Sequence, residues 1–196
     1  MRYLLGMVLL SSSLTLLSGR SARVNAKDDT VGTKAGQANW ISCAVKLGAN
    51  VPVDTLSTVG KSLGFNNRYM KLTVVIGWVE SRWNMNAVSP VGAVGAMQVM
   101  PAAALHTDTL YGGMRTSVPN RLTDVKRNVT VGMRYLDLAK RECGSGEGLG
   151  PLDLMCIASM YNGGYRQLDN WKRNKLLHRE TANYAVNIIR TFEQCN

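Results

Sequence analysis

This chain of 196 residues is predicted to adopt an all-α, or nearly all-α, fold. Apolar residues gather in helix-length segments, and residues that cap or end helices stand at the boundaries of these segments. Few stretches alternate between polar and apolar residues in the way that half-buried strands do. The length suits one domain preceded by a targeting segment, with enough residues for a sizeable core.

The first half of the chain is expected to hold a polar, glycine-bearing leader followed by three helices. Asp54 and Asn67 can cap the second and third helices, and Gly64 can end the second. The third helix is apolar on nearly every face, which predicts that it is buried in the middle of the domain. The leader and the three helices are expected at 27–38, 40–47, 54–63 and 67–83.

The second half is expected to hold a turn and four more helices. Pro101 suits the first position of a helix, and Asp124 begins another with an apolar stripe. Asn162-Gly163-Gly164 is expected to close the helix that follows. The turn is expected at 89–95, and the helices are expected from 101 onward and at 124–141, 152–161 and 180–194.

The first 26 residues have the features of an export signal. Arg2 supplies a positive start, an apolar run follows, and Val24-Asn25-Ala26 offers small residues for cleavage. This predicts an exported, periplasmic protein, with an uncleaved membrane anchor as the alternative. Removal of residues 1–26 takes away three arginines and no acids, so the formal charge falls from +10 to +7.

The mature chain is therefore basic, and basic surfaces attract polyanions. No nucleic-acid motif and no basic run with interleaved aromatics is visible, so nucleic acid is not an expected partner. The peptidoglycan wall, whose stem peptides carry carboxylates, is the more plausible anion for an exported protein.

Four scattered cysteines fit an oxidising compartment better than a metal site, and neither a metal nor a cofactor is expected. Cys143 and Cys156 flank a glycine-rich segment, and a bridge between them would close that loop. Cys43 and Cys195 would then join the N-terminal helix to the C-terminal end. Three pairings are formally possible, and the sequence does not choose among them.

Glu80 is the most informative single residue. It ends the apolar run 72–79, and such surroundings disfavour its charged form, so its pKa should rise. A glutamic acid that stays protonated near neutral pH can act as a general acid. The alternative is that Glu80 is the exposed end of a core helix.

Four blocks in this order resemble lytic transglycosylases with the soluble-transglycosylase domain, which are related in fold to goose-type lysozyme. Any one block is weak, whereas four at suitable spacing are specific. They span about 65–190, and small or apolar departures occur at Ala96, Met160, Gly163 and Ala185. The blocks are Glu80-Ser81 with Ala87-Val88-Ser89-Pro90 and Gly92-Ala93; Gly95-Ala96-Met97-Gln98 with Val99-Met100-Pro101; Asn128-Val129, Gly132 and Tyr135-Leu136 with Tyr161-Asn162-Gly163; and Glu180-Thr181 with Tyr184.

The resemblance implies a lysozyme-like catalytic domain with a substrate cleft over 65–196, preceded by a leader and helical segment at 27–64. It implies that Glu80 protonates the glycosidic oxygen between N-acetylmuramic acid and N-acetylglucosamine. The ionised Glu80 then takes a proton from the C6 hydroxyl of the sugar, which attacks the anomeric carbon and leaves a 1,6-anhydro end. Most glycosidases use two carboxylates, and the motif blocks hold no second acid near Glu80.

Three residues are implied to contact the sugar in the first part of the cleft. Ser89 orients the N-acetyl group, and Gln98 and Met100 line the cleft. Taken without the resemblance, Ser89 is equally well explained as the start of a Ser-Pro turn, and Met100 is more simply a core residue.

Four further residues are implied to complete the cleft. Tyr161 hydrogen-bonds near Glu80 and helps to set its protonation, Asn162 holds the loop after its helix, and Glu180 faces sugar hydroxyls or peptide. Tyr184 flanks the same subsite as Glu180. A half-buried core tyrosine is the alternative for Tyr161, and a first-turn acid favoured by the helix dipole is the alternative for Glu180.

Two rival functions remain open. A lysozyme-like hydrolase would leave reducing ends, and a non-catalytic wall-binding component would release nothing. No nucleophile elbow, zinc-protease motif or phosphate-binding loop occurs. The small size resembles transglycosylases that open the wall for secretion, conjugation or pilus machines, which would then be partners, and a phage-borne enzyme is the alternative.

Overall fold

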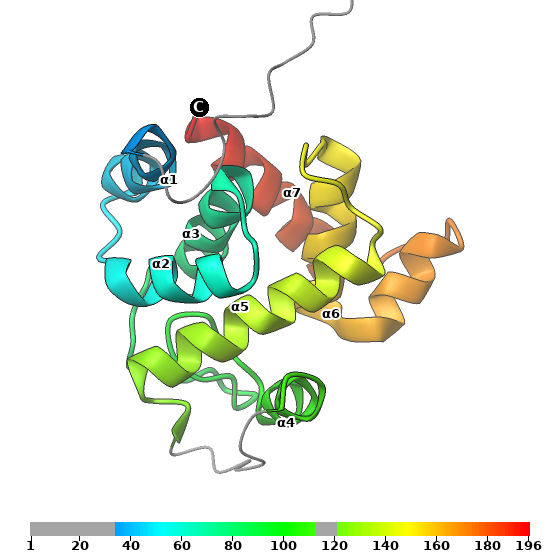
Figure 1. Cartoon of the computed structure of the whole chain (residues 1–196). Coiled ribbons are helices and arrows are strands. Elements are labelled where there is room, and N and C mark those ends of the chain that lie inside the picture. The colour runs from blue at the N-terminus through cyan, green and yellow to red at the C-terminus, as the bar shows by residue number, and fades with distance from the viewer. Residues whose placement is uncertain (1–33, 113–120) are drawn as a thin grey trace, which may run out of the picture.

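The computed structural model describes residues 34–112 and 121–196. Within these residues it holds seven helices and no strand beyond isolated bridges, which confirms the all-α prediction (Figure 1). The predicted export signal lies outside the described residues. The helices are α1 (Lys34–Leu47), α2 (Val53–Ser62), α3 (Asn67–Ser81), α4 (Pro101–Leu110), α5 (Val125–Glu142), α6 (Pro151–Lys172) and α7 (Arg179–Gln194).

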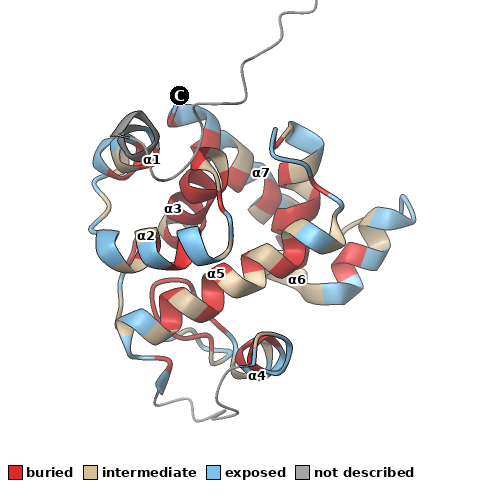
Figure 2. Ribbon diagram, viewed as in Figure 1, coloured by how far each residue is buried: buried red, intermediate tan, exposed pale blue. Residues whose placement is uncertain are grey.

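Helix α3 forms the centre of the domain, as its apolar sequence predicts. Every side chain from Tyr69 to Ile76 is buried, and α1 and α7 pack against the helix (Figure 2). Helix α5 lies across α2, α4 and α6 (Figure 1). Burial of an apolar helix on several sides removes most of its surface from water, which is the main stabilising term for such a fold. Glu80 therefore stands near the end of a rigid central element.

The caps of α2 and α3 differ from the sequence prediction by one or two residues. Pro52 precedes α2, so Asp54 lies within its first turn and does not cap it. Asn66 caps α3 by accepting a hydrogen bond from the Tyr69 amide at 3.1 Å, in place of the predicted Asn67. Asn66 and Asn67 are adjacent amides, and only the backbone decides which of them stays outside the helix.

Helix α3 ends at Ser81, two residues earlier than predicted. Arg82 and Trp83 both have positive φ, which turns the chain back on the helix. The Trp83 ring then lies against Gly77, where an added Cβ would stand 2.5 Å from the ring, and its indole donates to the Val74 carbonyl at 2.9 Å. The sequence predicts that Trp83 continues the helix, whereas in the structure its ring packs against the side of the helix.

Two other boundaries were wrongly predicted. Helix α1 begins at Lys34, so the second half of the segment predicted to be a loose leader is helical. Its alanines and Gln37 favour a helix in spite of Gly36. Helix α6 does not stop at Asn162-Gly163-Gly164: Gly164 adopts φ 64° and ψ −163°, which kinks the chain, and the helix then continues to Lys172. Only glycine adopts such angles without strain.

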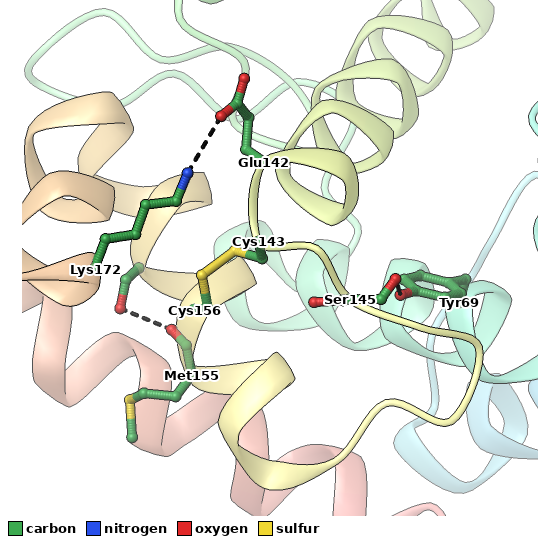
Figure 3. Close-up of a disulfide and its surroundings, with 8 residues drawn as sticks. Tyr69, Glu142, Cys143, Ser145, Met155, Cys156 and Lys172 are labelled. Atoms are coloured by element: carbon green, nitrogen blue, oxygen red, sulfur yellow. Dashed lines mark hydrogen bonds and ion pairs between the residues drawn. A yellow bond between two sulfur atoms is a disulfide. The ribbon is translucent and has the colours of Figure 1, made fainter.

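Two disulfides join helices of the domain, one between neighbouring helices and one between its two ends. Cys143 at the end of α5 pairs with Cys156 in α6, and Lys172 reaches Glu142 beside this bridge at 3.5 Å (Figure 3). Cys43 in α1 pairs with Cys195 after α7. The structure thus selects the favoured pairing from the three that the sequence left open. Among the described helices, none is long and apolar enough to cross a membrane.

Candidate active site

Glu80 lies in the last turn of α3, half-buried, with its side chain toward α7. The Tyr184 hydroxyl donates a hydrogen bond of 2.7 Å to Glu80 Oε1. Burial raises the pKa of Glu80 from 4.5 to about 7, and the hydrogen bond from Tyr184 opposes that rise by favouring the charged form. Near neutral pH both protonation states of Glu80 are therefore well populated. A group that first gives and then takes a proton needs both states.

Tyr161 lies on α6 close to the same carboxylate. Burial, followed by the charge of Glu80, holds the pKa of the Tyr161 hydroxyl well above its usual range. This hydroxyl donates to the Met97 carbonyl at 3.0 Å, so the hydroxyl bonded directly to Glu80 belongs to Tyr184. The hydrogen-bonding role implied for Tyr161 thus falls on a different tyrosine in the structure.

The acids that the sequence left open as second carboxylates are engaged elsewhere. Asp108 is buried and pairs with Arg127, and Asp124 caps α5. Glu147 lies near Tyr69 in the first turn of α3, where its charge acts on the hydroxyl of that tyrosine. Eleven residues of helix, about 16 Å, separate Tyr69 from Glu80. None of these three acids is therefore placed to act as a second carboxylate beside Glu80.

The loop after α3 is held against α5 by a buried amide. Asn128 donates to the carbonyls of Val94 and Leu122 at 2.7 and 3.1 Å, and it accepts from the Met97 amide at 3.0 Å. An added Cβ at Gly95 would stand 2.4 Å from this amide, so glycine is required there. Helix α5 thus determines where the loop passes Glu80.

The three predicted residues of this loop take different positions. The Ser89 hydroxyl accepts from the Ala93 amide at 2.9 Å within the turn, and the amide nitrogen of Gln98 donates to the Gly95 carbonyl at 2.9 Å. Met100 precedes α4 and is 40% exposed. Of the three, Gln98 and Met100 line the main cavity of the domain.

That cavity has a volume of about 410 Å³ and lies between α4, α5 and α6. Tyr161 and Asn162 come from α6, Tyr135 from α5 and His106 from α4. The Tyr135 and Tyr161 rings meet edge to face, with centroids 5.6 Å apart. Clefts of this size, with mostly apolar walls and a few polar groups, enclose small organic ligands, and sugar rings offer the faces that aromatic side chains contact.

A second hollow of about 290 Å³ begins at Asn162 and extends to the start of α7. Glu180 is exposed in its wall, whereas Asn162 accepts a hydrogen bond of 2.9 Å from the Thr181 hydroxyl. An added Cβ at Gly163 would stand 3.0 Å from the Thr181 hydroxyl, so this glycine allows the close contact between α6 and α7. With the exception of Ser89, the predicted residues thus fall into two adjoining hollows and the Glu80–Tyr184 pair.

Three further residues, Tyr135, His106 and Tyr165, line the cavity but were not predicted from the sequence to be site residues. Tyr135 follows Gly132 by three residues on α5, and both line the cavity. Residues three apart lie on the same face of a helix, so this spacing could have predicted that Tyr135 lines the same cleft as Gly132. His106 and Tyr165 gave no such signal, because the kink at Gly164 determines where Tyr165 lies.

The helical architecture and the position of Glu80 put this chain in the class of lysozyme-like helical domains. It belongs to the Transglycosylase SLT domain family, which matches residues 61–183. The soluble lytic murein transglycosylases of Escherichia coli K12 and Salmonella typhimurium LT2 are 33% and 30% identical to it over 95 residues. These 95 residues are 48% of this chain and 14% of each relative.

Solved structures agree with this assignment. The 70 kDa soluble lytic transglycosylase of Escherichia coli is 25% identical and superposes with a TM-score of 0.62 over 72% of this chain and 23% of that one. The same 70 kDa enzyme has been solved with bulgecin A, with a TM-score of 0.61. An inactive Glu-to-Gln variant of a Pseudomonas aeruginosa lytic transglycosylase shares the fold, with 24% identity and a TM-score of 0.55.

Proposed function

We propose that this protein is a peptidoglycan lytic transglycosylase. In this reaction the β-1,4 bond between N-acetylmuramic acid and N-acetylglucosamine breaks without water and leaves a 1,6-anhydro-muramic end. The observation that carries the proposal is the state of Glu80, a carboxyl group whose pKa is raised by burial to about 7. Family membership and the relatives named as lytic transglycosylases support the same reaction.

In the first step, Glu80 acts as the general acid. Tyr184 donates to Oε1, which leaves Oε2 to carry the proton of the neutral form. That proton passes to the glycosidic oxygen as the bond breaks, and positive charge develops at the anomeric carbon of the muramic residue. The hydrogen bond from Tyr184 strengthens as Glu80 becomes charged, because bonds to ionised groups are stronger than neutral ones.

In the second step, Glu80 acts as the general base. The ionised carboxylate takes the proton of the C6 hydroxyl, and the C6 oxygen bonds to the anomeric carbon. Glu80 is then neutral again, so the cycle closes without a second carboxylate. The engagement of Asp108 and Asp124 elsewhere is consistent with this use of one group.

The cellular setting of the enzyme is a wider proposal. The export-like N-terminus supports action in the periplasm, on glycan strands that are already assembled. The proposed task there is local wall opening for a secretion, conjugation or pilus machine, whose components would then be partners.

Glu80→Gln tests the proposed catalyst. The substitution keeps the shape of the side chain and removes the proton that is transferred, so release of soluble fragments from purified sacculi should stop. The melting temperature should stay at or above that of the wild type, because a half-buried charge is removed. Full activity in a well-folded Glu80→Gln protein would refute the mechanism.

A further inference from the structure

Two aromatic side chains from opposite walls of the main cavity touch each other. His106 comes from α4 and Tyr165 from the part of α6 beyond its kink, and both line the cavity. Their ring centroids are 5.8 Å apart with an interplanar angle of 88°, an edge-to-face contact. The two rings therefore bridge the hollow at that point.

The contact lies at the end of the cavity that is remote from Gln98. Along α4, the cavity is lined from Met100 to His106, which is six residues or roughly 9 Å of helix. Along α6, it is lined from Tyr161, which adjoins Glu80, to Tyr165. The His106 and Tyr165 side chains therefore touch at the end of the cavity away from Glu80.

Tyr165 is directed to this place by the backbone and by its neighbours. Gly164 has φ 64°, and this turn of the chain separates Tyr165 from Tyr161. Partial burial and the adjacent Glu142 carboxylate raise the pKa of the Tyr165 hydroxyl, and Lys172 in turn holds Glu142 at 3.5 Å. The ring is thus positioned from two sides, although nearly half of it is exposed.

We propose that the His106–Tyr165 contact blocks the passage of a glycan strand, so that this chain binds and cleaves strands from an end. A polymer can be cut in its interior only if it passes through the site in both directions. A cavity of about 410 Å³ that is bounded by this contact has room for only a few sugars. The cleavage part of this inference rests on the proposed transglycosylase function, whereas the strand-end binding does not.

Cleavage is tested on peptide-free glycan strands, by the length of the strands that remain when equal numbers of bonds have been broken. The wild type should release short saccharides while the mean strand length changes little. Tyr165→Ala and His106→Ala remove one side of the contact, so the mean length should fall severalfold at the same number of broken bonds. Tyr165→Phe keeps the ring and should behave as the wild type.

Leu105→Ala is the matched control, because Leu105 is exposed on the same helix but does not line the cavity. Its strand-length profile should equal that of the wild type. Interior cutting by the wild type from the outset would overturn the proposal. So would Tyr165→Ala and His106→Ala profiles that match the wild type.

Binding separates this inference from the proposed reaction. Glu80→Gln, which should not cleave, is bound to glycan strands sorted by length. If the site takes strand ends, the number of protein molecules per strand stays constant as the strands lengthen. If the site takes interior sugars, that number grows in proportion to length, and the inference is wrong even where cleavage occurs. Adding Tyr165→Ala to Glu80→Gln should convert the first behaviour into the second.

Discussion

Glu80 owes its chemistry to the balance of two environments at one carboxyl group. The apolar end of α3 disfavours its charge, and the Tyr184 hydroxyl favours it. Removal of either contribution would move the pKa away from neutrality, toward a group that is only an acid or only a base. The pKa of about 7 thus suits a group that must alternate between both roles.

The pH dependence of cleavage should show this balance. The acid step needs protonated Glu80, and because the pKa is raised from 4.5 to about 7, the protonated form persists up to about neutral pH. We therefore expect kcat/KM to fall as the pH rises through about 7. Initial rates of sacculus solubilisation over a pH range that spans both 4.5 and about 7 would measure the effect. An alkaline limb near pH 4.5 would show that burial does not act on Glu80.

Tyr184→Phe should move the alkaline limb to higher pH. Its hydroxyl stabilises ionised Glu80, and hydrogen bonds to charged groups contribute about 1.5–3 kcal/mol, or roughly one to two pKa units. The rate should also fall about tenfold or more, because the higher pKa makes Glu80 a weaker acid and its charged form loses a hydrogen bond in the first step.

Tyr161→Phe is the comparison, since the Tyr161 hydroxyl bonds to the Met97 carbonyl. The alkaline limb of the Tyr161→Phe pH profile should stay at nearly the same pH as in the wild type, even if the rate of cleavage falls. If Tyr184→Phe and Tyr161→Phe moved the limb equally, the hydrogen bond to Glu80 would not be the cause.

At the scale of elements, the loop that passes Glu80 depends on one side chain of α5. Asn128 is 1% exposed, and its amide satisfies three backbone groups of the neighbouring segments. Buried backbone groups without partners are costly, so a helix placed behind a loop can position it through a single amide.

Asn128→Ala should lower the free energy of unfolding by about 3–4 kcal/mol, because it leaves buried carbonyls and an amide without partners. Asn187→Ala, at an exposed position on α7, should change it by less than about 0.5 kcal/mol. Denaturant titration of both variants measures the difference, and a loss in Asn128→Ala no larger than in Asn187→Ala would contradict this account of the loop.

The elements were largely predictable, whereas their ends were not. Apolar length and periodicity identified α3, α5 and α7, and the predicted start at Asp124 is the residue that caps α5. The prediction failed where tertiary contacts decide the backbone. Trp83 packs on Gly77 rather than extending α3, and Gly164 kinks α6 rather than ending it.

At the scale of the whole molecule, two disulfides act over very different lengths of chain. Cys43–Cys195 closes 152 residues and joins α1 to the end of α7, whereas Cys143–Cys156 closes 13. A longer closed loop restricts the unfolded chain more, so the first bridge should stabilise the fold more.

Replacement of Cys43 and Cys195 by serine should cost about 5 kcal/mol, against about 3 kcal/mol for Cys143 and Cys156, by the chain-entropy relation. Denaturant unfolding of the two double variants, each with the other bridge intact, measures the difference. A larger loss on removing the short bridge would show that native-state contacts outweigh chain entropy here.

The arrangement of the site is also a property of the whole molecule. The sequence pointed to Glu80 because an acid after an apolar run is a local signal. The Glu80–Tyr184 pair joins residues 104 positions apart, and the His106–Tyr165 contact depends on the kink of α6. Neither contact has a local pattern, so only the packed helices reveal them.

The masses of the fragments that the purified protein releases from peptidoglycan test the central claim most directly. A transglycosylase joins C6 to the anomeric carbon and consumes no water, so each cut should yield an anhydro-muramic end, one water lighter than a reducing end. Anhydro ends in the wild-type digest, absent with Glu80→Gln, are the predicted result. Reducing ends would contradict the account, because they would require an attacking water and a hydrolytic mechanism.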